Sequence, residues 1–250
     1  MLKKSFYSLL VVPSMLVLSS QTAVAEQSEQ AKKNWSGSGE VGYNQKTGNV
    51  ESDSLLARLK LKLAREQTDY KSLLELENKT ENDVKVSERY VLDLQADRYF
   101  SKDKSYYAYI NGRGEQDKIA GTDQDLSLTV GLGKVLYRTE MTELSTELGA
   151  GYQEVRFALE TAENQNFNQT TGRAKFDLNH KFNDVISFAQ DALYFFGEEQ
   201  YKIETNTGLR AALNSRFSVS TSYKYRYNSN PAEDAVKTDS ETNLTMIYSF

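Results

Sequence analysis

The chain has 250 residues, a formal net charge of −5, no cysteine and one histidine. A mildly acidic chain lacks the basic face that binds phosphates, so we expect no nucleic-acid partner. The lack of cysteine excludes disulfides and a lipid-anchored cysteine, and no run of about 18 apolar residues follows residue 25, which excludes a helical membrane protein.

The first residues predict an export signal. Lys3 and Lys4 precede an apolar run over 6–18, and the small residues Ala23 and Ala25 follow it. This order is typical of a secretory signal peptide that is cleaved after Ala25. We therefore expect a signal peptide over 1–25 and one domain over 26–250. Loss of the two lysines changes the net charge from −5 to about −7.

An alternation of period two begins near residue 55. Leu55, Leu59 and Leu63 lie on one parity, while Arg58 and Lys60 lie on the other. A strand sends these two sets to opposite faces, whereas a helix would scatter them around its axis. Strands that cross a membrane need apolar residues only at every second position, so an average hydropathy hides them. The alternation therefore favours membrane-spanning strands.

About twelve segments carry this pattern, most of them about ten to fourteen residues long, which suffices to cross a bilayer when tilted. The expected strands are 36–46, 54–66, 70–80, 87–99, 106–117, 123–136, 143–156, 169–182, 185–196, 201–213, 216–228 and 238–250. No expected strand contains a proline, since Pro13 lies in the signal peptide and Pro231 in a loop. If both ends face the periplasm, Phe182, Phe217 and Phe250 lie near one rim, as an aromatic girdle requires.

The predicted fold is all-β: a transmembrane, antiparallel, up-and-down β-barrel of about twelve strands in the outer membrane of a Gram-negative bacterium. A periplasmic or secreted β-sandwich also alternates, but its strands average about five or six residues. The chain stops on an alternating strand with an aromatic end, formed by Leu244, Met246, Tyr248 and Phe250. Such an end resembles the signal that the barrel-assembly machinery recognises. The expected partners are outer-membrane lipid, this machinery during biogenesis, and small solutes or ions.

The inward parity carries charges that the hairpin turns place opposite one another. A turn centred between Gln67 and Thr68 would set Arg58 opposite Glu77 and Lys60 opposite Glu75. The same construction across the loop with Pro231 sets two further pairs, Arg226 with Asp239 and Lys224 with Glu241. Opposite charges across strands stabilise a register by about 0.2–1 kcal/mol per pair. These eight residues are the predicted lumen charges.

Two functions fit such an interior. Charged rings in an aqueous pore select small solutes, which predicts a narrow channel or a small-solute or ion translocator. A lumen of about twelve strands is modest, so long side chains could instead close it with salt bridges and leave a non-conducting barrel that supports envelope integrity. The side chains able to fill it are Arg58, Lys60, Lys62, Arg173, Lys175, Arg210 and Arg226. Basic and acidic residues are roughly balanced, so neither anion nor cation preference follows.

No catalytic, cofactor or metal site is predicted. A lipid-modifying outer-membrane enzyme would need a serine beside His180, and no serine motif of that kind stands there. Zinc sites lack ligands in a chain with one histidine and no cysteine. We expect His180 to be an interfacial residue without a catalytic role.

Several short motifs together resemble a known family. They are Trp35-Ser36-Gly37, Gly42-Tyr43, Thr47-Gly48-Asn49, Glu88-Arg89-Tyr90, Gly149-x-Gly151-Tyr152, Lys237-Thr238-Asp239 and Tyr248-Ser249-Phe250. In this order and spacing the chain resembles the YdiY-like family of salt-induced outer-membrane proteins, a domain of unknown function. The resemblance covers nearly the whole predicted mature chain. It implies a barrel in the outer membrane and a link to salt or osmotic stress, and it carries no substrate or catalytic residues.

Overall fold

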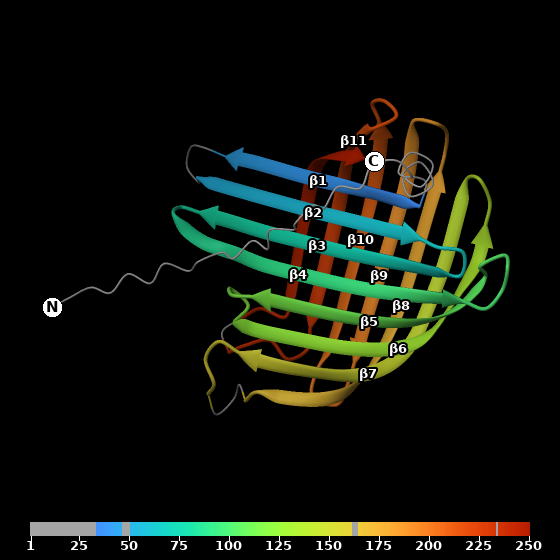
Figure 1. Ribbon diagram of the computed structural model, residues 1–250. Coiled ribbons are helices and arrows are strands. Elements are labelled where there is room, and N and C mark those ends of the chain that lie inside the picture. Colours follow the sequence, from blue (N-terminus) through green and yellow to red (C-terminus); the bar gives the residue numbers. More distant parts are fainter. Residues whose placement is uncertain (1–33, 47–50, 162–164, 234) are drawn as a thin grey trace, which may run out of the picture. The chain divides into compact units, whose positions relative to one another are not determined.

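The computed structural model describes residues 34–46, 51–161, 165–233 and 235–250, which form twelve strands (Figure 1). The strands are β1 (Trp35–Lys46), β2 (Ser52–Ala64), β3 (Thr68–Glu81), β4 (Val84–Tyr99), β5 (Tyr106–Asp117), β6 (Thr122–Arg138), β7 (Thr142–Phe157), β8 (Phe167–Lys181), β9 (Ile186–Phe196), β10 (Tyr201–Ala212), β11 (Phe217–Asn228) and β12 (Thr238–Ser249). Within these described ranges, no helix is long and apolar enough to cross a membrane.

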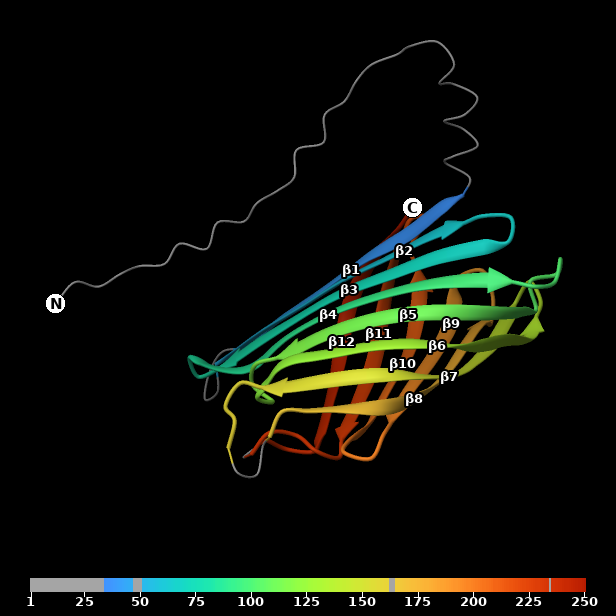
Figure 2. The ribbon, with the colours of Figure 1, turned by 60° about the horizontal axis from the view of Figure 1, so that its bottom comes forward.

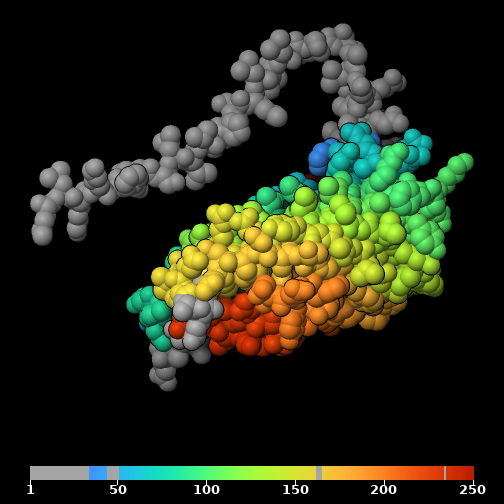
Figure 3. Space-filling view, turned by 90° about the horizontal axis from the view of Figure 1, so that it is seen from below, coloured from blue at the N-terminus to red at the C-terminus, as the bar shows by residue number. Residues whose placement is uncertain are grey.

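The strands close into one antiparallel barrel. Each pairs with its neighbours in sequence, and β1 pairs with β12 to complete the ring. Main-chain hydrogen bonds of 2.8 and 3.0 Å between Gly37 and Phe250 extend this seam. The walls are tilted, so near and far strands cross in projection (Figure 2), and the outer wall is continuous where middle and late strands meet (Figure 3). The predicted fold class is confirmed.

The barrel has two ends, which differ in their connections. We call the end where β1 begins and β12 finishes the terminal end, and the other the loop end. Turns at the terminal end have three to six residues, while connections at the loop end have two to nine.

The loops at both ends carry side chains whose pKa is shifted by hydrogen bonds. At the terminal end, hydrogen bonds from Ser101 and Ser105 hold the pKa of Asp103 at about 2. At the loop end, a hydrogen bond to Glu88 raises the pKa of Lys118.

Alternating side chains give the wall two different faces. In β6, Leu126, Leu128 and Val130 are exposed on the outside, while Ser127 and Thr129 are buried in the lumen. An apolar outer face is stable only against lipid, because in water it would present a wide exposed patch. Aromatic side chains extend the outer face near both ends, at the positions expected for girdles. The strand pattern therefore produces an apolar shell around a polar interior.

One predicted register is wrong. The structure pairs Arg58 with Glu75 and Lys60 with Leu73, not with Glu77 and Glu75. The reason is the turn over 65–67, which begins after Ala64 and is closed by a 2.8 Å hydrogen bond from the Arg65 N–H to the Thr68 carbonyl. Its centre lies one residue earlier than expected, which shifts the pairing by two and leaves each side chain on its predicted face.

Glycines on the inner wall of β6 and β7 make room for tyrosines of β5. A Cβ at Gly133 would overlap the ring of Tyr107, and one at Gly149 would overlap the hydroxyl of Tyr109. Tyr107 is buried and donates a 2.9 Å hydrogen bond to Glu147. These glycines therefore allow close packing of rings against the wall, which is a common reason for glycine within a strand.

We expect Gly133→Ala to lower the free energy of unfolding by about 1–3 kcal/mol, because the added methyl group displaces Tyr107. The measurement is urea unfolding of the barrel in lipid vesicles. Gly112→Ala is the matched control, since a Cβ at Gly112 would meet no atom within 4 Å. Equal stability of the two variants would contradict this account of the inner wall.

Candidate functional site: a bridged lumen

A cluster of ion pairs crosses the lumen between its two ends. We call it the central bridge and define it by four cations, Arg89, Arg113, Lys224 and Arg226, and four carboxylates, Glu75, Glu77, Glu115 and Glu204. All eight side chains lie on the inward parity of their strands. The formal charges of the bridge therefore cancel.

Arg89 is the centre of the bridge. Its guanidinium donates to Glu75 at 2.8 Å, to Glu115 at 2.9 Å and to Glu204 at 3.0 Å, and Glu77 lies at 3.7 Å. Only 1% of its side chain is exposed. A charge removed from water this completely needs matched partners, which the surrounding carboxylates provide.

The bridge joins opposite walls. Arg89 on β4 contacts Glu204 on β10, and five strands separate β4 from β10 in either direction around the ring. Lys224 on β11 also crosses part of the lumen, since it contacts Glu75 and Glu77 on β3, from which β12, β1 and β2 separate it. Arg113 adds a 2.7 Å contact from β5 to Glu204. These contacts span the lumen rather than lining it.

A second polar cluster fills the lumen beside β7 and β8. Arg173 donates to Glu147 at 2.6 Å and to Gln95 at 3.3 Å, and Gln95 also donates to Glu147 at 2.8 Å. All three are buried. Tyr107 joins this cluster through its hydrogen bond to Glu147, and Arg173 and Gln95 form part of the lining of the cavity nearer to the terminal end.

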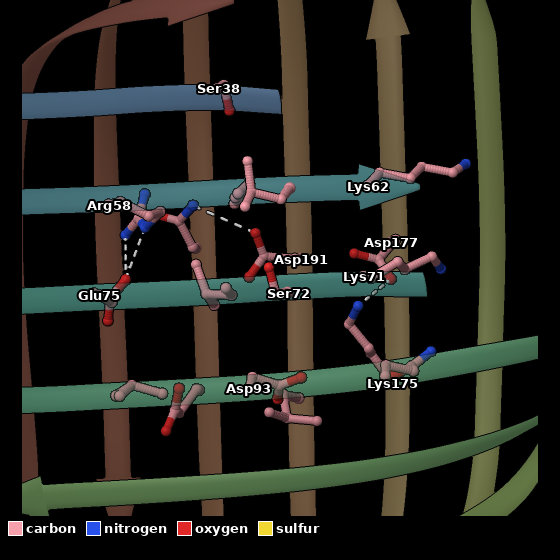
Figure 4. A pocket seen from close by; sticks show the side chains of 18 of the residues that line it. Ser38, Arg58, Lys62, Lys71, Ser72, Glu75, Asp93, Lys175, Asp177 and Asp191 are labelled. Atoms are coloured by element: carbon pink, nitrogen blue, oxygen red, sulfur yellow. Dashed lines mark hydrogen bonds and ion pairs between the residues drawn. The ribbon is translucent and has the colours of Figure 1, made fainter. Parts of the chain in front are cut away.

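Cavities lie on both sides of the central bridge. The terminal-end cavity has a volume of about 500 Å³, and its lining includes Arg58, Lys60, Lys62, Lys71 and Lys175 (Figure 4). The loop-end cavity has a volume of about 400 Å³ and is lined by Asp117, Asp239 and Glu241 together with Lys79, Glu81 and Arg226. Inward charges are therefore segregated along the barrel axis, although their totals are roughly balanced.

The predicted lumen charges all lie in this region. The register sets Lys224 opposite Glu241 and Arg226 opposite Asp239, the partners that the hairpin construction gives. Their ion pairs nevertheless run elsewhere, since Lys224 contacts Glu75 and Glu77, and Arg226 contacts Glu77 at 2.6 Å. Cross-strand neighbours thus set the register, while contacts across the lumen decide the pairing.

Sequence reasoning missed the residues at the centre of the bridge. The predicted lumen charges do not include four residues that stand on the charged parity of their strands: Arg89, Arg113, Glu115 and Glu204. Alternation could have placed them inward. The sequence does not indicate which strands face each other across the barrel, or at which level along its axis. The ion-pair partners across the lumen therefore could not be predicted.

The remaining predicted residues lie outside the lumen. His180 receives or donates a 2.7 Å hydrogen bond at Nδ1 with the Thr142 hydroxyl and packs edge-on against Phe182. Leu244, Met246, Tyr248 and Phe250 are exposed on the outer face. Ala23 and Ala25 fall outside the described residues. Among those described, no group of three or more His, Cys, Asp or Glu residues could hold a metal ion.

Comparisons with known proteins agree with this architecture. A family profile described as "Protein of unknown function, DUF481" matches residues 39–250. The uncharacterized protein YdiY of Escherichia coli (strain K12) is 26% identical over 231 residues, which cover 90% of this chain and 87% of that protein. The NanC porin superposes with a TM-score of 0.52 at 11% identity, covering 86% of this chain and 98% of that one. The KdgM porin gives 0.43 at 12% identity, with coverages of 86% and 99%.

Proposed function

The chain belongs to the DUF481 family, the YdiY-like family that its motifs resemble, and from this premise we propose that it is an outer-membrane channel for small solutes or ions. In this proposal the central bridge closes the channel, because its ion pairs cross the lumen between the two cavities. Opening it requires the ion pairs to separate or rearrange, while the barrel wall keeps its hydrogen bonds.

One observation carries this proposal. The obstruction between the two charged cavities consists of ion-paired side chains from the wall, and the described residues contain no helix. The loop between β11 and β12 adds Val236 to the lining on the loop side of the bridge, but it supplies none of the eight bridging side chains. Long side chains change rotamer far more readily than a folded plug leaves a barrel. The charged cavity at each end also provides a site where hydrated ions can bind before they pass the central bridge.

The second candidate is a non-conducting barrel that contributes to envelope integrity. The near-complete burial of Arg89 among carboxylates favours it, because such a network can be a permanent part of the interior. In that case the bridge is the core of the protein rather than a gate.

Planar-bilayer recording of the purified protein separates the two. A channel is expected to give discrete current steps, and more of them as the salt concentration rises. The absence of current steps at every salt concentration and voltage would leave the non-conducting barrel. Conductance would equally remove that second candidate.

A link to salt or osmotic stress is part of the proposal. Screening by salt weakens ion pairs that water can reach, and in the central bridge these are the pairs of Glu204 and Arg226, whose side chains are 19% and 16% exposed. High ionic strength outside the cell would therefore favour opening. This reasoning supplies a physical motive for the salt link that the resemblance of the motifs implies.

We further propose export by the 1–25 signal, insertion by the barrel-assembly machinery and an outer-membrane address in contact with lipid. Deletion of Phe250 is expected to lower the heat-modifiable, folded fraction while export continues. The reason is that Phe250 stacks on Tyr248, with the ring centroids 5.9 Å apart, and exchanges two main-chain hydrogen bonds with Gly37.

Phe250→Ala is the control that keeps those main-chain bonds. If the machinery reads the terminal ring, this variant also folds poorly in cells, yet refolds normally in detergent. A normal folded fraction in cells for both variants would remove the proposed assembly signal.

A further inference from the structure

We propose that the terminal-end cavity binds a small organic anion that carries carboxylate or phosphate groups. This names the solute class for the proposed channel and rests on that function for passage across the barrel. Binding itself needs only the folded cavity. The inference is carried by the charges of the lining, by two cations without partners, and by one buried donor without an acceptor.

The lining of this cavity is predominantly basic. Nine basic residues line it: Arg58, Lys60, Lys62, Lys71, Arg113, Arg173, Lys175, Arg210 and Lys224. Five acidic residues do so: Glu75, Asp93, Asp177, Asp191 and Glu204. Other carboxylates that neutralise these cations, such as Asp69 and Asp97, are buried behind them. A molecule inside the cavity therefore meets an excess of positive groups.

Two of the cations have no partner. In the part of the chain that the structure describes, Lys60 and Arg210 form neither an ion pair nor a hydrogen bond, and both are exposed toward the lumen. Their strand neighbours offer no carboxylate, because Lys60 lies opposite Leu73, and Arg210 lies between serines. Asp191 attracts Lys60 from another wall without pairing with it.

A buried donor in the same lining is also unsatisfied. Arg173 uses its two terminal nitrogens on Glu147 and Gln95, but its Nε has no hydrogen-bond partner among the described residues. The side chain is only 1% exposed. Buried donors are rarely left without an acceptor, and the Tyr109 ring, 4.9 Å from the guanidinium carbon, also carries a hydroxyl without a partner, so polar groups beside this cavity have unused hydrogen-bonding capacity.

Like charges also face each other at the mouth. Lys62 and Lys71 are direct partners across β2 and β3, an arrangement that destabilises a sheet unless something compensates for it. Each has one aspartate, at 3.0 and 2.7 Å respectively, and Lys175 lines the same cavity (Figure 4). An anion between these lysines would relieve their repulsion.

The size of the cavity indicates an organic ligand. A volume of about 500 Å³ lies in the usual range for small-molecule sites and far exceeds that of a single inorganic ion. Ser38 and Asn206 add neutral groups that can bind hydroxyls. Guanidinium and ammonium groups recognise carboxylates and phosphates through charge-assisted hydrogen bonds, so these are the groups expected on the ligand.

Calorimetric titration of citrate into the purified, detergent-folded barrel tests the inference. We expect saturable binding, and an affinity at least about tenfold weaker in the double variant Lys60→Ala/Arg210→Ala. Inorganic phosphate should bind more weakly than citrate, and glucose and spermidine should not bind. The control is Lys102→Ala/Lys134→Ala, which removes two positive charges outside the cavity at the same end.

Lack of citrate binding to the native barrel, or equal binding by the cavity and control variants, would overturn the inference. If the double variant does not fold to a heat-modifiable barrel, the single variant Arg210→Ala replaces it. Its affinity for citrate should also be weaker than that of the native barrel. The channel proposal fails separately. Citrate binding without conductance would leave the anion site and remove the channel, while conductance without citrate binding would do the reverse.

Discussion

Arg89→Ala is expected to lower the free energy of unfolding by about 3–5 kcal/mol, since the substitution breaks a buried charge network by removing one partner. It leaves Glu75, Glu115 and Glu204 close together with fewer cations to offset them. Urea unfolding in lipid vesicles measures the change. The single tryptophan, Trp35, is half exposed at the terminal end and reports on unfolding.

Arg138→Ala is the control for loss of an arginine. Arg138 pairs with Glu143 at 3.3 Å, but 40% of its side chain is exposed, so we expect a change of less than about 1 kcal/mol. Adding Glu115→Gln to Arg89→Ala should recover part of the lost stability, because it removes one orphaned charge. Equal effects of Arg89→Ala and Arg138→Ala would show that the central bridge is not buried as described.

A single cysteine at position 239 should react with a polymer-linked maleimide on intact cells, while one at position 60 should not. Asp239 lines the loop-end cavity and Lys60 the terminal-end cavity, with the central bridge between them. The native chain has no cysteine, so each introduced thiol is the only target. The contrast is all or none, and labelled protein is read as a shift on a denaturing gel.

Broken envelopes provide the control, because there both positions should react. Labelling of position 60 alone on intact cells would reverse the proposed orientation, in which the terminal end faces the periplasm. Labelling of both on intact cells would mean that the central bridge does not close the lumen to this reagent.

The fold could be predicted from the sequence because period two is a local property. All twelve expected strands are present, with ends shifted by at most three residues, and the β5 range 106–117 agrees at both ends. The register of β11 with β12 follows from its loop in the same way. The β2–β3 hairpin differs because its three-residue turn is centred one position earlier than expected, and turn length within a polar stretch has no clear sequence signal.

The interior could be predicted only in part. Parity alone places Arg58 and Glu75 in the lumen, since a strand side chain has two faces to choose from. The contact between Arg89 and Glu204 joins residues 115 positions apart, and it depends on barrel closure, strand tilt and stagger together. Barrel closure, strand tilt and stagger also decide which charges meet in the basic cavity and which in the acidic one. The composition therefore shows only that basic and acidic inward residues are roughly equal in number.

The most direct test of the central claim is the single-channel conductance of the native barrel beside Arg89→Gln/Glu204→Gln, recorded in the same bilayers and salt. If the central bridge closes a channel, the native protein gives brief or small current steps and the double variant gives steps several-fold larger or longer. Arg156→Gln/Glu154→Gln, an exposed ion pair on the outer face of β7, should behave as the native protein does. Identical currents from native and double-variant barrels, or none from either, would contradict the account.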